Sequence, residues 1–407
     1  SGERHNCALS NYGIVKCWGR GGNGRLGYNS SSSLGDDDGE MGQNLPSIYF
    51  GEGRTVVYLS VGGYHNVVLL DDGTLRAWGS NFVAQLGLGH RVDVGSGVTS
   101  DGTDYYVHDA VVDLGSVTVV AIASGMYSNC ALLDDGQLKC WGYNGQGQLG
   151  YGDVDYRGAE TSDSMGEALP TVALGTDRYA VSVGLGVFHT CALLDNGAVK
   201  CWGYNTFGQL GYDDVDQRGD NADEMGDNLP EISFNTESRV TQLAVGAHHN
   251  CALFSDQSLR CWGDNDNGIL GLGHTSDVGR EAGQMAELLG IDVLGSSSAT
   301  ITSIQLGYFH NCVLLSDGTV KCWGQGYLLG YGDFESRGDG ADELGDALPT
   351  VDIAGTAVAV TTGYLHTCVT LDDLSVKCWG GHDYGQLGIG SGIETGYYIG
   401  TGEGEMG

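Results

Sequence analysis

The sequence has few basic residues and no long apolar run. It carries 18 Lys and Arg against 52 Asp and Glu, which gives a formal net charge of −34. Nucleic-acid binding depends on Lys and Arg neutralising phosphates, so we expect no nucleic-acid partner. No stretch approaches eighteen consecutive apolar residues, so we expect no membrane insertion either. Cations and basic proteins are the natural counterparts of such a charge, although solubility alone also accounts for it.

Proline is rare and helical periodicity is absent. The chain has 4 Pro and 71 Gly, a balance that indicates many tight turns and no Pro-rich linker. A Trp-Gly pair recurs at intervals of 56 to 63 residues, and each follows two short β-type runs joined by a turn, as in "HTCALLDNGAVKCWG" from His189. Two more β-type runs follow in most copies, as in "ALPTVALG" and "RYAVSVG". The seven tryptophans are Trp18, Trp78, Trp141, Trp202, Trp262, Trp323 and Trp379.

Four short strands in each of seven units predict an all-β fold. We expect a seven-bladed β-propeller with four-stranded antiparallel blades, forming one domain over residues 1–407. One Trp per unit most simply packs in the core between neighbouring blades. The last unit stops at "EMG", which elsewhere precedes two further strands, so we expect the seventh blade to be incomplete in this chain. Residues before Ser1, residues after Gly407 or a neighbouring molecule would then close the ring.

The repeated pattern "GxxHxCAL…GxVKCWGxNxxGQLG" resembles the regulator of chromosome condensation repeat, in a secreted, disulfide-containing form. The resemblance covers essentially the whole chain and implies seven-bladed propellers. It says little about function, because members of that family act as nucleotide-exchange factors, chromatin binders, ubiquitin-ligase modules and secreted enzyme inhibitors. The chromatin role needs basic surfaces that this chain lacks, and no insertion matches the family's GTPase-engaging wedge.

The 12 cysteines form pairs at constant spacing. In the hairpin around "DNG", a three-residue loop sets Leu194 opposite Ala198 and therefore Cys191 opposite Cys201. Directly facing residues have Cα atoms about 4.5 Å apart, close enough for a disulfide. The same spacing predicts the pairs Cys7–Cys17, Cys130–Cys140, Cys191–Cys201, Cys251–Cys261, Cys312–Cys322 and Cys368–Cys378. Six bridges indicate an oxidising compartment, outside the cell or at its surface.

Zinc is the rival interpretation, because a histidine lies two residues before most of the first cysteines. The second copy loses both cysteines together, leaving Val67 and Ala77, while His65 remains. The third copy has Ser128 in place of the histidine and keeps its cysteines. The cysteines therefore vary with each other and not with the histidine, which favours disulfides. The recurring histidines are expected to be buried or channel-lining hydrogen-bonding groups: His5, His65, His189, His249, His310 and His366.

Acidic loops recur in copies three, four and six, for example "YDDVDQRGDNADEMGDNLP". Closely spaced carboxylates supply the hard oxygen ligands that calcium prefers, although the spacing is not that of an EF-hand and an arginine lies inside each cluster. Calcium is therefore a possible cofactor, and solvated loops are the alternative. The candidate ligands are Asp214, Asp216, Asp220, Asp223, Asp227, Asp333, Asp339, Asp342 and Asp346. Asn29, in "NSS", matches the N-glycosylation pattern.

No pair of residues stands out as a general acid and base, because the carboxylates repeat as a loop motif. We therefore expect a non-enzymatic extracellular protein, structural or adhesive, such as a subunit of a surface assembly or filament. Its partners would be further copies of itself or an extracellular protein or glycan. A secreted binding module, acting as a protein inhibitor or a glycan binder, is the alternative, and an enzyme acting on polysaccharide is a third.

Overall fold

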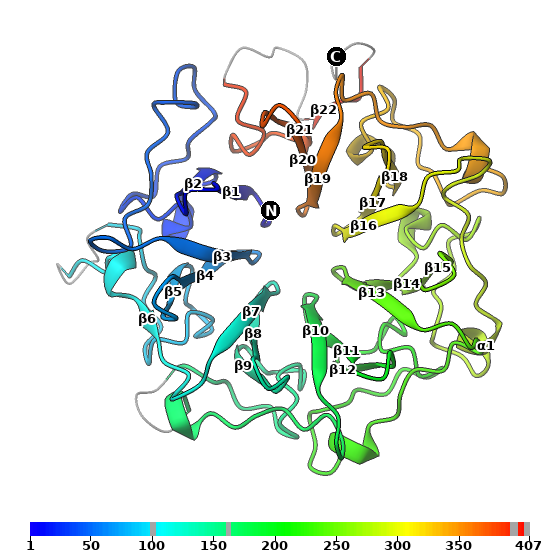
Figure 1. The fold of residues 1–407 in the computed structure, drawn as a ribbon, viewed down its shortest axis with the longest axis horizontal. Coiled ribbons are helices and arrows are strands. Elements are labelled where there is room, and N and C mark those ends of the chain that lie inside the picture. The colour runs from blue at the N-terminus through cyan, green and yellow to red at the C-terminus, as the bar shows by residue number, and fades with distance from the viewer. Residues whose placement is uncertain (98–102, 160–163, 391–397, 403–407) are drawn as a thin grey trace.

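A computed structural model describes residues 1–97, 103–159, 164–390 and 398–402. Within these ranges the chain forms seven antiparallel sheets, which radiate from a central channel as the blades of a propeller (Figure 1). We number them blades 1 to 7 in chain order. The same ranges contain no helix with the length and apolar character needed to cross a bilayer.

Within each blade, the strands lie in chain order from the channel to the outer rim. Blades 1 to 3 contain β1 (His5–Leu9) and β2 (Val15–Gly19); β3 (Val56–Val61), β4 (His65–Leu70), β5 (Leu75–Gly79) and β6 (Val111–Val112); and β7 (Val119–Ser124), β8 (Ser128–Leu133) and β9 (Leu138–Gly142). Blades 4 and 5 contain β10 (Ala180–Leu185), β11 (His189–Leu194) and β12 (Val199–Gly203); and β13 (Val240–Val245), β14 (His249–Phe254) and β15 (Leu259–Gly263). Blades 6 and 7 contain β16 (Ile301–Leu306), β17 (His310–Leu315) and β18 (Val320–Gly324); and β19 (Ala357–Thr362), β20 (His366–Leu371), β21 (Val376–Gly381) and β22 (Tyr398–Ile399).

Helical structure is confined to the loops. The α-helix α1 (Gln284–Glu287) has four residues. Short 3₁₀ turns lie at η1 (Gly22–Gly24), η2 (Val107–Asp109), η3 (Gly166–Ala168), η4 (Gly226–Asn228), η5 (Asp266–Gly268), η6 (Gly326–Leu328) and η7 (Gly345–Ala347).

The second strand of a blade is buried on both faces. In blades 2 to 6 the strands β4, β8, β11, β14 and β17 are buried at every position. This explains why "HTCALL" reads as a continuous apolar run without alternation: a neighbouring blade covers each face.

The outermost strand of a blade is less regular than the predicted four-stranded blades suggest. In blade 4 the outer segment contributes a single main-chain hydrogen bond to the ladder, from Ile232 N to Val199 O (2.9 Å). Other carbonyls of the outer segments are taken by side chains of the next blade. Lys200, for example, donates from Nζ to Leu174 O of blade 3 (2.8 Å). The outer segments are therefore held mainly by buried side chains such as Ile232 and Phe234.

The six hairpins between second and third strands that contain cysteine keep their disulfides in register. The structure joins Cys7–Cys17, Cys130–Cys140, Cys191–Cys201, Cys251–Cys261, Cys312–Cys322 and Cys368–Cys378, with no free cysteine. In blade 2, Val67 and Ala77 face each other at the same site and are fully buried. An apolar pair thus fills the volume that a disulfide fills elsewhere.

The last hairpin keeps the common turn despite its sequence. Leu374 occupies the position of the turn glycine, although leucine at positive φ is strained. The structure places Leu374 at φ 70°, with the same bond to Leu371 O (3.0 Å) that Gly197 makes to Leu194 O (2.9 Å). Pairing of the flanking strands outweighs the local strain.

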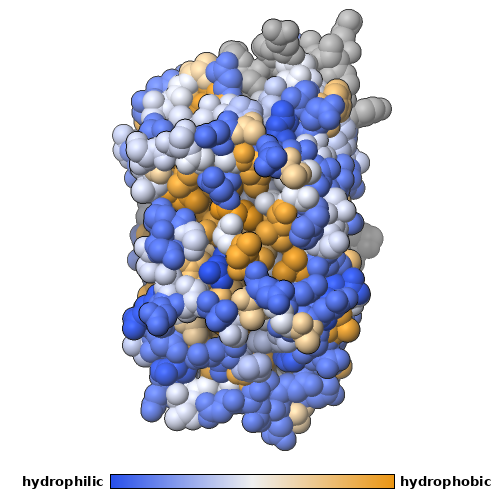
Figure 2. All heavy atoms as spheres, turned by 90° about the vertical axis from the view of Figure 1, so that its right-hand side faces the viewer, coloured by the Kyte–Doolittle hydropathy of each residue, from blue (hydrophilic) through white to orange (hydrophobic). Residues whose placement is uncertain are grey.

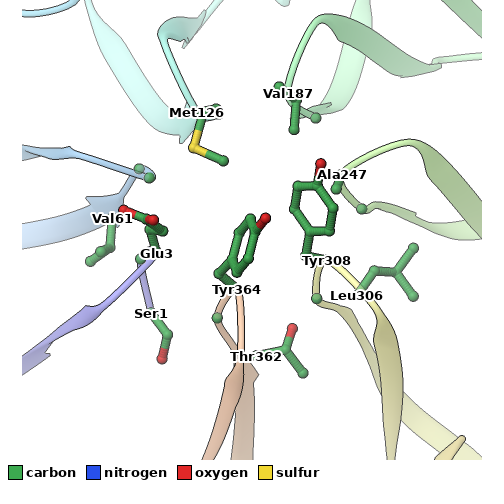
Figure 3. A pocket seen from close by; sticks show the side chains of 18 of the residues that line it. Ser1, Glu3, Val61, Met126, Val187, Ala247, Leu306, Tyr308, Thr362 and Tyr364 are labelled. Carbon is green, nitrogen blue, oxygen red and sulfur yellow. The ribbon is translucent and has the colours of Figure 1, made fainter. Parts of the chain in front are cut away.

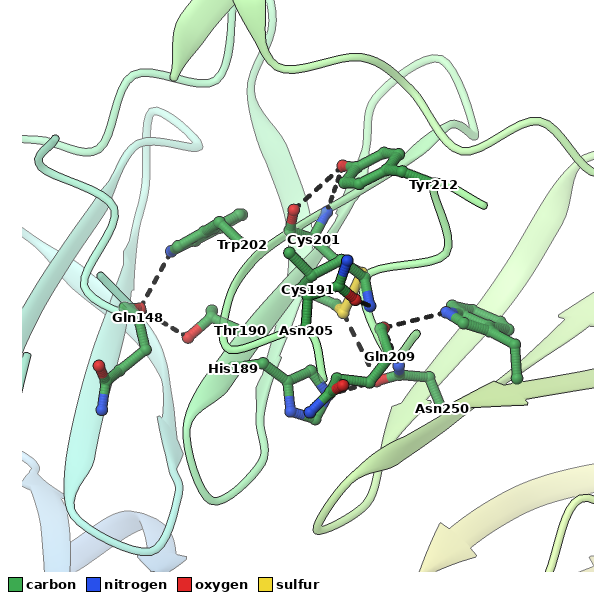
Figure 4. Close-up of a disulfide and its surroundings, with 12 residues drawn as sticks. Gln148, His189, Thr190, Cys191, Cys201, Trp202, Asn205, Gln209, Tyr212 and Asn250 are labelled. Carbon is green, nitrogen blue, oxygen red and sulfur yellow. Dashed lines mark hydrogen bonds between the residues drawn. A yellow bond between two sulfur atoms is a disulfide. The ribbon is translucent and has the colours of Figure 1, made fainter. Parts of the chain in front are cut away.

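A carbonyl of the preceding blade accepts a bond from six of the seven recurring tryptophans, all but Trp141. At the junction of blades 3 and 4, Gln148 O accepts bonds from Trp202 Nε1 (3.0 Å) and Thr190 Oγ1 (2.8 Å) (Figure 4). At the next junction, Gln209 O accepts from Trp262 Nε1 (3.1 Å) and Asn250 Nδ2 (2.8 Å). The indoles are buried between blades, so these bonds join neighbours that share no β-ladder.

The recurring histidines make a second bond between neighbouring blades. His189 Nε2 lies 2.9 Å from Asn250 Oδ1, and His249 Nε2 lies 2.7 Å from Asn311 Oδ1. At the last junction His366 Nε2 lies 2.8 Å from Asn6 Oδ1, so the bonds run from blade 7 back to blade 1. Burial lowers the pKa of His65 and His249 to about 4 and of His189, His310 and His366 to about 3. These imidazoles are therefore neutral parts of the core at physiological pH.

Main-chain bonds join neighbouring blades around the channel at six of the seven junctions. Residues at the turn between first and second strands donate to the next blade in the pairs Glu3–Gly63, Gly63–Gly125, Met126–Gly186, Val187–Ala247, Ala247–Gly307 and Tyr364–Gly2. The Tyr364–Gly2 bond (3.2 Å) joins blade 7 to blade 1, whose described sheet has two strands. Blades 7 and 1 are thus in contact beside the channel.

Candidate functional site at the channel mouth

One end of the central channel carries a continuous series of aromatic side chains. The residue just before the recurring histidine position lies on this end, and it is Tyr64, Tyr127 or Phe188 in blades 2 to 4. The Tyr64 and Tyr127 rings stack at 5.5 Å, and the Tyr127 and Phe188 rings stack at 5.8 Å. These side chains are half-buried, so part of each ring faces solvent.

The segment after the third strand adds a second layer to this end. Tyr143 N donates to Tyr127 O (3.0 Å), and Tyr204 N donates to Phe188 O (2.9 Å). These bonds place the Tyr143 ring 5.6 Å from that of Phe188, and the Tyr204 ring 6.3 Å from it. The fold itself therefore brings two repeat positions, about sixteen residues apart, to one surface.

The series continues through blades 5 to 7. Tyr204 contacts His248 at 6.4 Å, His248 contacts Tyr308 at 5.5 Å, and Tyr308 contacts Tyr364 at 4.1 Å between ring centroids. We call the whole set the aromatic arc: Tyr64, Tyr127, Tyr143, Phe188, Tyr204, Phe207, His248, Tyr308, Phe309 and Tyr364.

Blade 1 fills the remaining part of the circle with charge. Arg25 is 1% exposed, lies 3.5 Å from Glu3 Oε2 and places its guanidinium 5.0 Å from the Tyr64 ring centroid. Arg4 and Arg20 lie over the Tyr384 ring at 4.8 and 4.7 Å. The mouth thus combines stacking surfaces with a buried ion pair and two arginines.

Beneath the arc the channel is narrow. It forms a cavity of about 290 Å³, lined largely by glycines and small apolar residues of the innermost strands. Tyr308 and Tyr364 lie over its opening, with Met126 and Glu3 at its edge (Figure 3). Burial, with Tyr364 adjacent, raises the pKa of Tyr308 to about 12, so its phenol stays protonated and can donate a hydrogen bond.

One carboxyl group stands beside the arc. Asp264 N donates to His248 O (3.0 Å), so Asp264 holds in blade 5 the position that Tyr143 and Tyr204 hold in blades 3 and 4. Burial, with Asp266 and Asp277 nearby, raises the pKa of Asp264 to about 6. Burial lowers the pKa of His248 to about 4. The arrangement therefore offers aromatic faces, phenol groups and a carboxyl that titrates in the mildly acidic range.

The repeat units match the model of the Regulator of chromosome condensation (RCC1) repeat. The matched segments are residues 56–85, 119–148, 180–209, 240–269 and 301–332, and a second model of the same repeat matches residues 196–253. The chain contains RCC1 repeats.

The relatives of this RCC1-repeat propeller have varied roles. The Ultraviolet-B receptor UVR8 of Arabidopsis thaliana is 29% identical over 303 residues, covering 74% of this chain and 60% of the receptor. The X-linked retinitis pigmentosa GTPase regulator homolog of Caenorhabditis elegans is 27% identical over 379 residues, covering 85% of this chain and 25% of that protein. The chain thus spans less than two thirds of each relative's length.

Solved structures show the same fold. Yeast RCC1 (Prp20), in its complex with Kap60, superposes with a TM-score of 0.69 at 20% identity, over 96% of this chain and 83% of that one. Human WBSCR16 superposes with a TM-score of 0.68 at 18% identity, over 94% of this chain and 92% of that one.

The aspartates proposed as calcium ligands in the RCC1-repeat propeller do not converge on one point. Asp214 and Asp333 pair with arginines four residues later, at 2.7 Å from Arg218 and 2.8 Å from Arg337. The Arg337 guanidinium lowers the pKa of Asp333. Across the described ranges, no three His, Cys, Asp or Glu side chains gather as a metal site requires. Asp214 and Asp333 are thus already paired with arginine, and calcium binding by these loops stays a prediction.

The remaining candidate aspartates stabilise loops. Asp227 accepts bonds from Thr176 N (2.7 Å), and Asp346 accepts from Ser296 N (2.6 Å), so each ties its loop to the preceding blade. Asp220 and Asp339 lie beside Glu224 and Glu343, and burial followed by that neighbouring carboxylate raises their pKa. Asp223 and Asp342 adopt left-handed backbone angles in tight turns, and Asp216 N bonds to Asp214 Oδ1 (3.0 Å).

Asn29 lies exposed in a bend of the propeller, at φ 54°. Its position leaves the side-chain amide accessible at the surface, and glycosylation there stays a prediction.

The aromatic arc is the feature that the sequence reasoning missed. The repeat position that supplies its first layer is occupied by Arg4, Tyr64, Tyr127, Phe188, His248, Phe309 and Leu365 along the seven repeats. Because no single residue type recurs there, the position shows no motif. Aligning the repeats on the histidine and asking which columns are rich in aromatic residues would have revealed it.

Proposed function

We propose that this RCC1-repeat propeller acts outside the cell as a non-enzymatic adhesive protein that binds its partner through the aromatic arc. The arc is the observation on which the proposal rests. Half-buried tyrosine and phenylalanine side chains, contiguous over several blades, are typical of the centres of protein interfaces. Members of the family bind proteins or act as regulators, which supports a binding role.

The extracellular setting is supported by the six disulfides. Bridges of this kind persist in oxidising surroundings and are rare where thiols are kept reduced. Blade 2 shows that an apolar pair suffices sterically, so the cysteines in the other six blades supply something beyond volume. Each bridge closes a loop of ten residues and contributes roughly 2–3 kcal/mol on the chain-entropy model.

The partner that fits the arc is an extracellular protein or glycan. Flat aromatic faces present apolar area at little cost in side-chain entropy, and the tyrosine hydroxyls supply hydrogen bonds at the rim. The net charge of −34 disfavours anionic partners. Assembly of copies into a filament stays a prediction.

Removing two adjacent rings tests the proposal. The double variant Tyr127→Ser, Phe188→Ser is expected to retain at least tenfold less extracellular material than the unaltered protein, because both rings lie in the middle of the arc. The material is collected from the cells that produce the protein. Immobilised protein and quantitative elution provide the measurement.

Tyr12→Ser is the matched control, because Tyr12 is 77% exposed in the β1–β2 hairpin at the other end of the blade. It should retain material like the unaltered protein, and thermal unfolding should show that all the proteins are folded. Equal retention by the double variant would count against the arc as the binding surface.

A further inference from the structure

A groove on the outer rim, between blades 5 and 6, is a second candidate surface. It has a volume of about 760 Å³ and lies between the segment that follows α1 and the loop of residues 340–345. Figure 2 shows apolar side chains gathered in a hollow on this side of the molecule, with hydrophilic residues around them. The groove lies outside the central channel and shares no lining residue with it.

The apolar floor of the groove departs from the repeat. Four blades carry a buried leucine followed by proline, and these account for all 4 prolines of the chain: Pro46, Pro170, Pro230 and Pro349. In blade 5 the buried leucine is Leu288, and Leu289 replaces the proline. Leu289 is 77% exposed, and it lines the groove with Leu272 and Leu344. Blade 5 therefore presents a leucine side chain where blades 1, 3, 4 and 6 have proline.

The walls of the groove are acidic. Asp277, Glu287, Asp292, Asp342 and Glu343 line it, and no Lys or Arg is among its described lining residues. Glu287, Asp292 and Asp342 are exposed. An apolar floor between carboxylates is complementary to a chain segment that carries leucine-like side chains on one face and Lys or Arg beside them.

We propose that this groove binds a basic amphipathic segment of another protein. The volume falls within the range of about 300–1,000 Å³ that is usual for binding clefts. A second copy of this chain is a poor occupant, because two molecules of net charge −34 repel each other and the groove adds acidic residues on its own side. The proposal is independent of the aromatic arc.

Synthetic peptides test the proposal directly. The probe is a labelled amphipathic helix of leucine and lysine, compared by fluorescence anisotropy at 0.15 M salt with a lysine–alanine peptide of equal charge and a leucine–glutamate peptide. The leucine–lysine peptide is expected to bind at least tenfold more tightly than either. Leu289→Ser should remove at least tenfold of that affinity, whereas Leu374→Gly, which removes a leucine 79% exposed in the last hairpin, should leave it unchanged.

Charge substitutions test the other half of the proposal. Glu287→Gln with Asp342→Asn should weaken binding several-fold and reduce its dependence on salt. Glu52→Gln with Glu237→Gln removes the same charge from exposed positions elsewhere and should have little effect. The Tyr127→Ser, Phe188→Ser variant should bind the peptide normally, so failure here and failure of the arc are distinguishable.

Three results would overturn the proposal. Equal binding by Leu289→Ser and the unaltered protein would place the peptide elsewhere. Equal binding of the leucine–glutamate peptide would leave the carboxylates without a role. Concentration-dependent dimers that Leu289→Ser abolishes, seen by sedimentation, would make a second copy the occupant.

Discussion

Replacing Asn250 with leucine is expected to lower the free energy of unfolding by about 2–4 kcal/mol. Asn250 Oδ1 accepts a bond from His189 Nε2 (2.9 Å) and Asn250 Nδ2 donates to Gln209 O (2.8 Å), so Asn250 makes two bonds from blade 5 to blade 4. Its loss leaves a fully buried imidazole nitrogen without a partner, and leucine of similar size fills the volume. Denaturant unfolding monitored by tryptophan fluorescence provides the measurement.

The chain supplies its own control for this substitution. Thr367 lies 2.7 Å from His310 Nε2, and Thr190 donates to Gln148 O (2.8 Å), so threonine performs each half of the role of Asn250 in other blades. Asn250→Thr should therefore cost about 1 kcal/mol or less. If the leucine and threonine variants were equally stable, the bonds between blades would not contribute as described.

Acidification from pH 6.5 to pH 4 is expected to unfold the propeller. Burial lowers the pKa of His65, His189, His249, His310 and His366 to between about 3 and about 4, and that of His5 well below its usual value. Below pH 6.5 the unfolded chain binds protons that the folded chain does not, so stability falls as pH falls. The five histidines other than His5 then each remove about 3 kcal/mol by pH 4, so together they reach the top of the usual margin of about 5–15 kcal/mol.

The pH dependence can be assigned to the histidines by copying another junction. His189→Ser with Asn250→Thr reproduces Ser128 and Thr190, the natural pair at the junction of blades 3 and 4. The unfolding free energy is measured between pH 6.5 and 5, above most carboxylate titration. In this variant its slope against pH should be smaller by about 1.4 kcal/mol per pH unit. An unchanged slope, or greater stability in acid, would show that these imidazoles do not govern acid unfolding.

The sequence predicted those features that each repeat determines locally. The hairpin from Cys191 to Cys201 has a fixed turn length, and turn length sets which residues face each other. Seven copies then served as variants of one another, so the paired loss at Val67 and Ala77 pointed to a disulfide without any structure. The propeller architecture follows from four short strands recurring seven times.

Features that depend on contact between blades were not predicted. The bond from Trp262 to Gln209 O spans 53 residues, and no spacing within one repeat suggests it. The aromatic arc likewise exists only because Tyr143 N bonds to Tyr127 O and the ring of blades places Tyr127 beside Phe188. The ion pair between Asp214 and Arg218 likewise depends on the loop conformation: both residues are in the motif, but only the folded loop shows that they face each other.

Disulfide mapping of the protein from its native source is the most direct test of an extracellular propeller. Digestion under non-reducing conditions, followed by mass spectrometry, should recover six bridges, each joining cysteines ten residues apart, as between Cys251 and Cys261. Free thiols at these positions in rapidly alkylated native material would contradict both the oxidising location and the reinforced blades on which the proposed adhesive role depends.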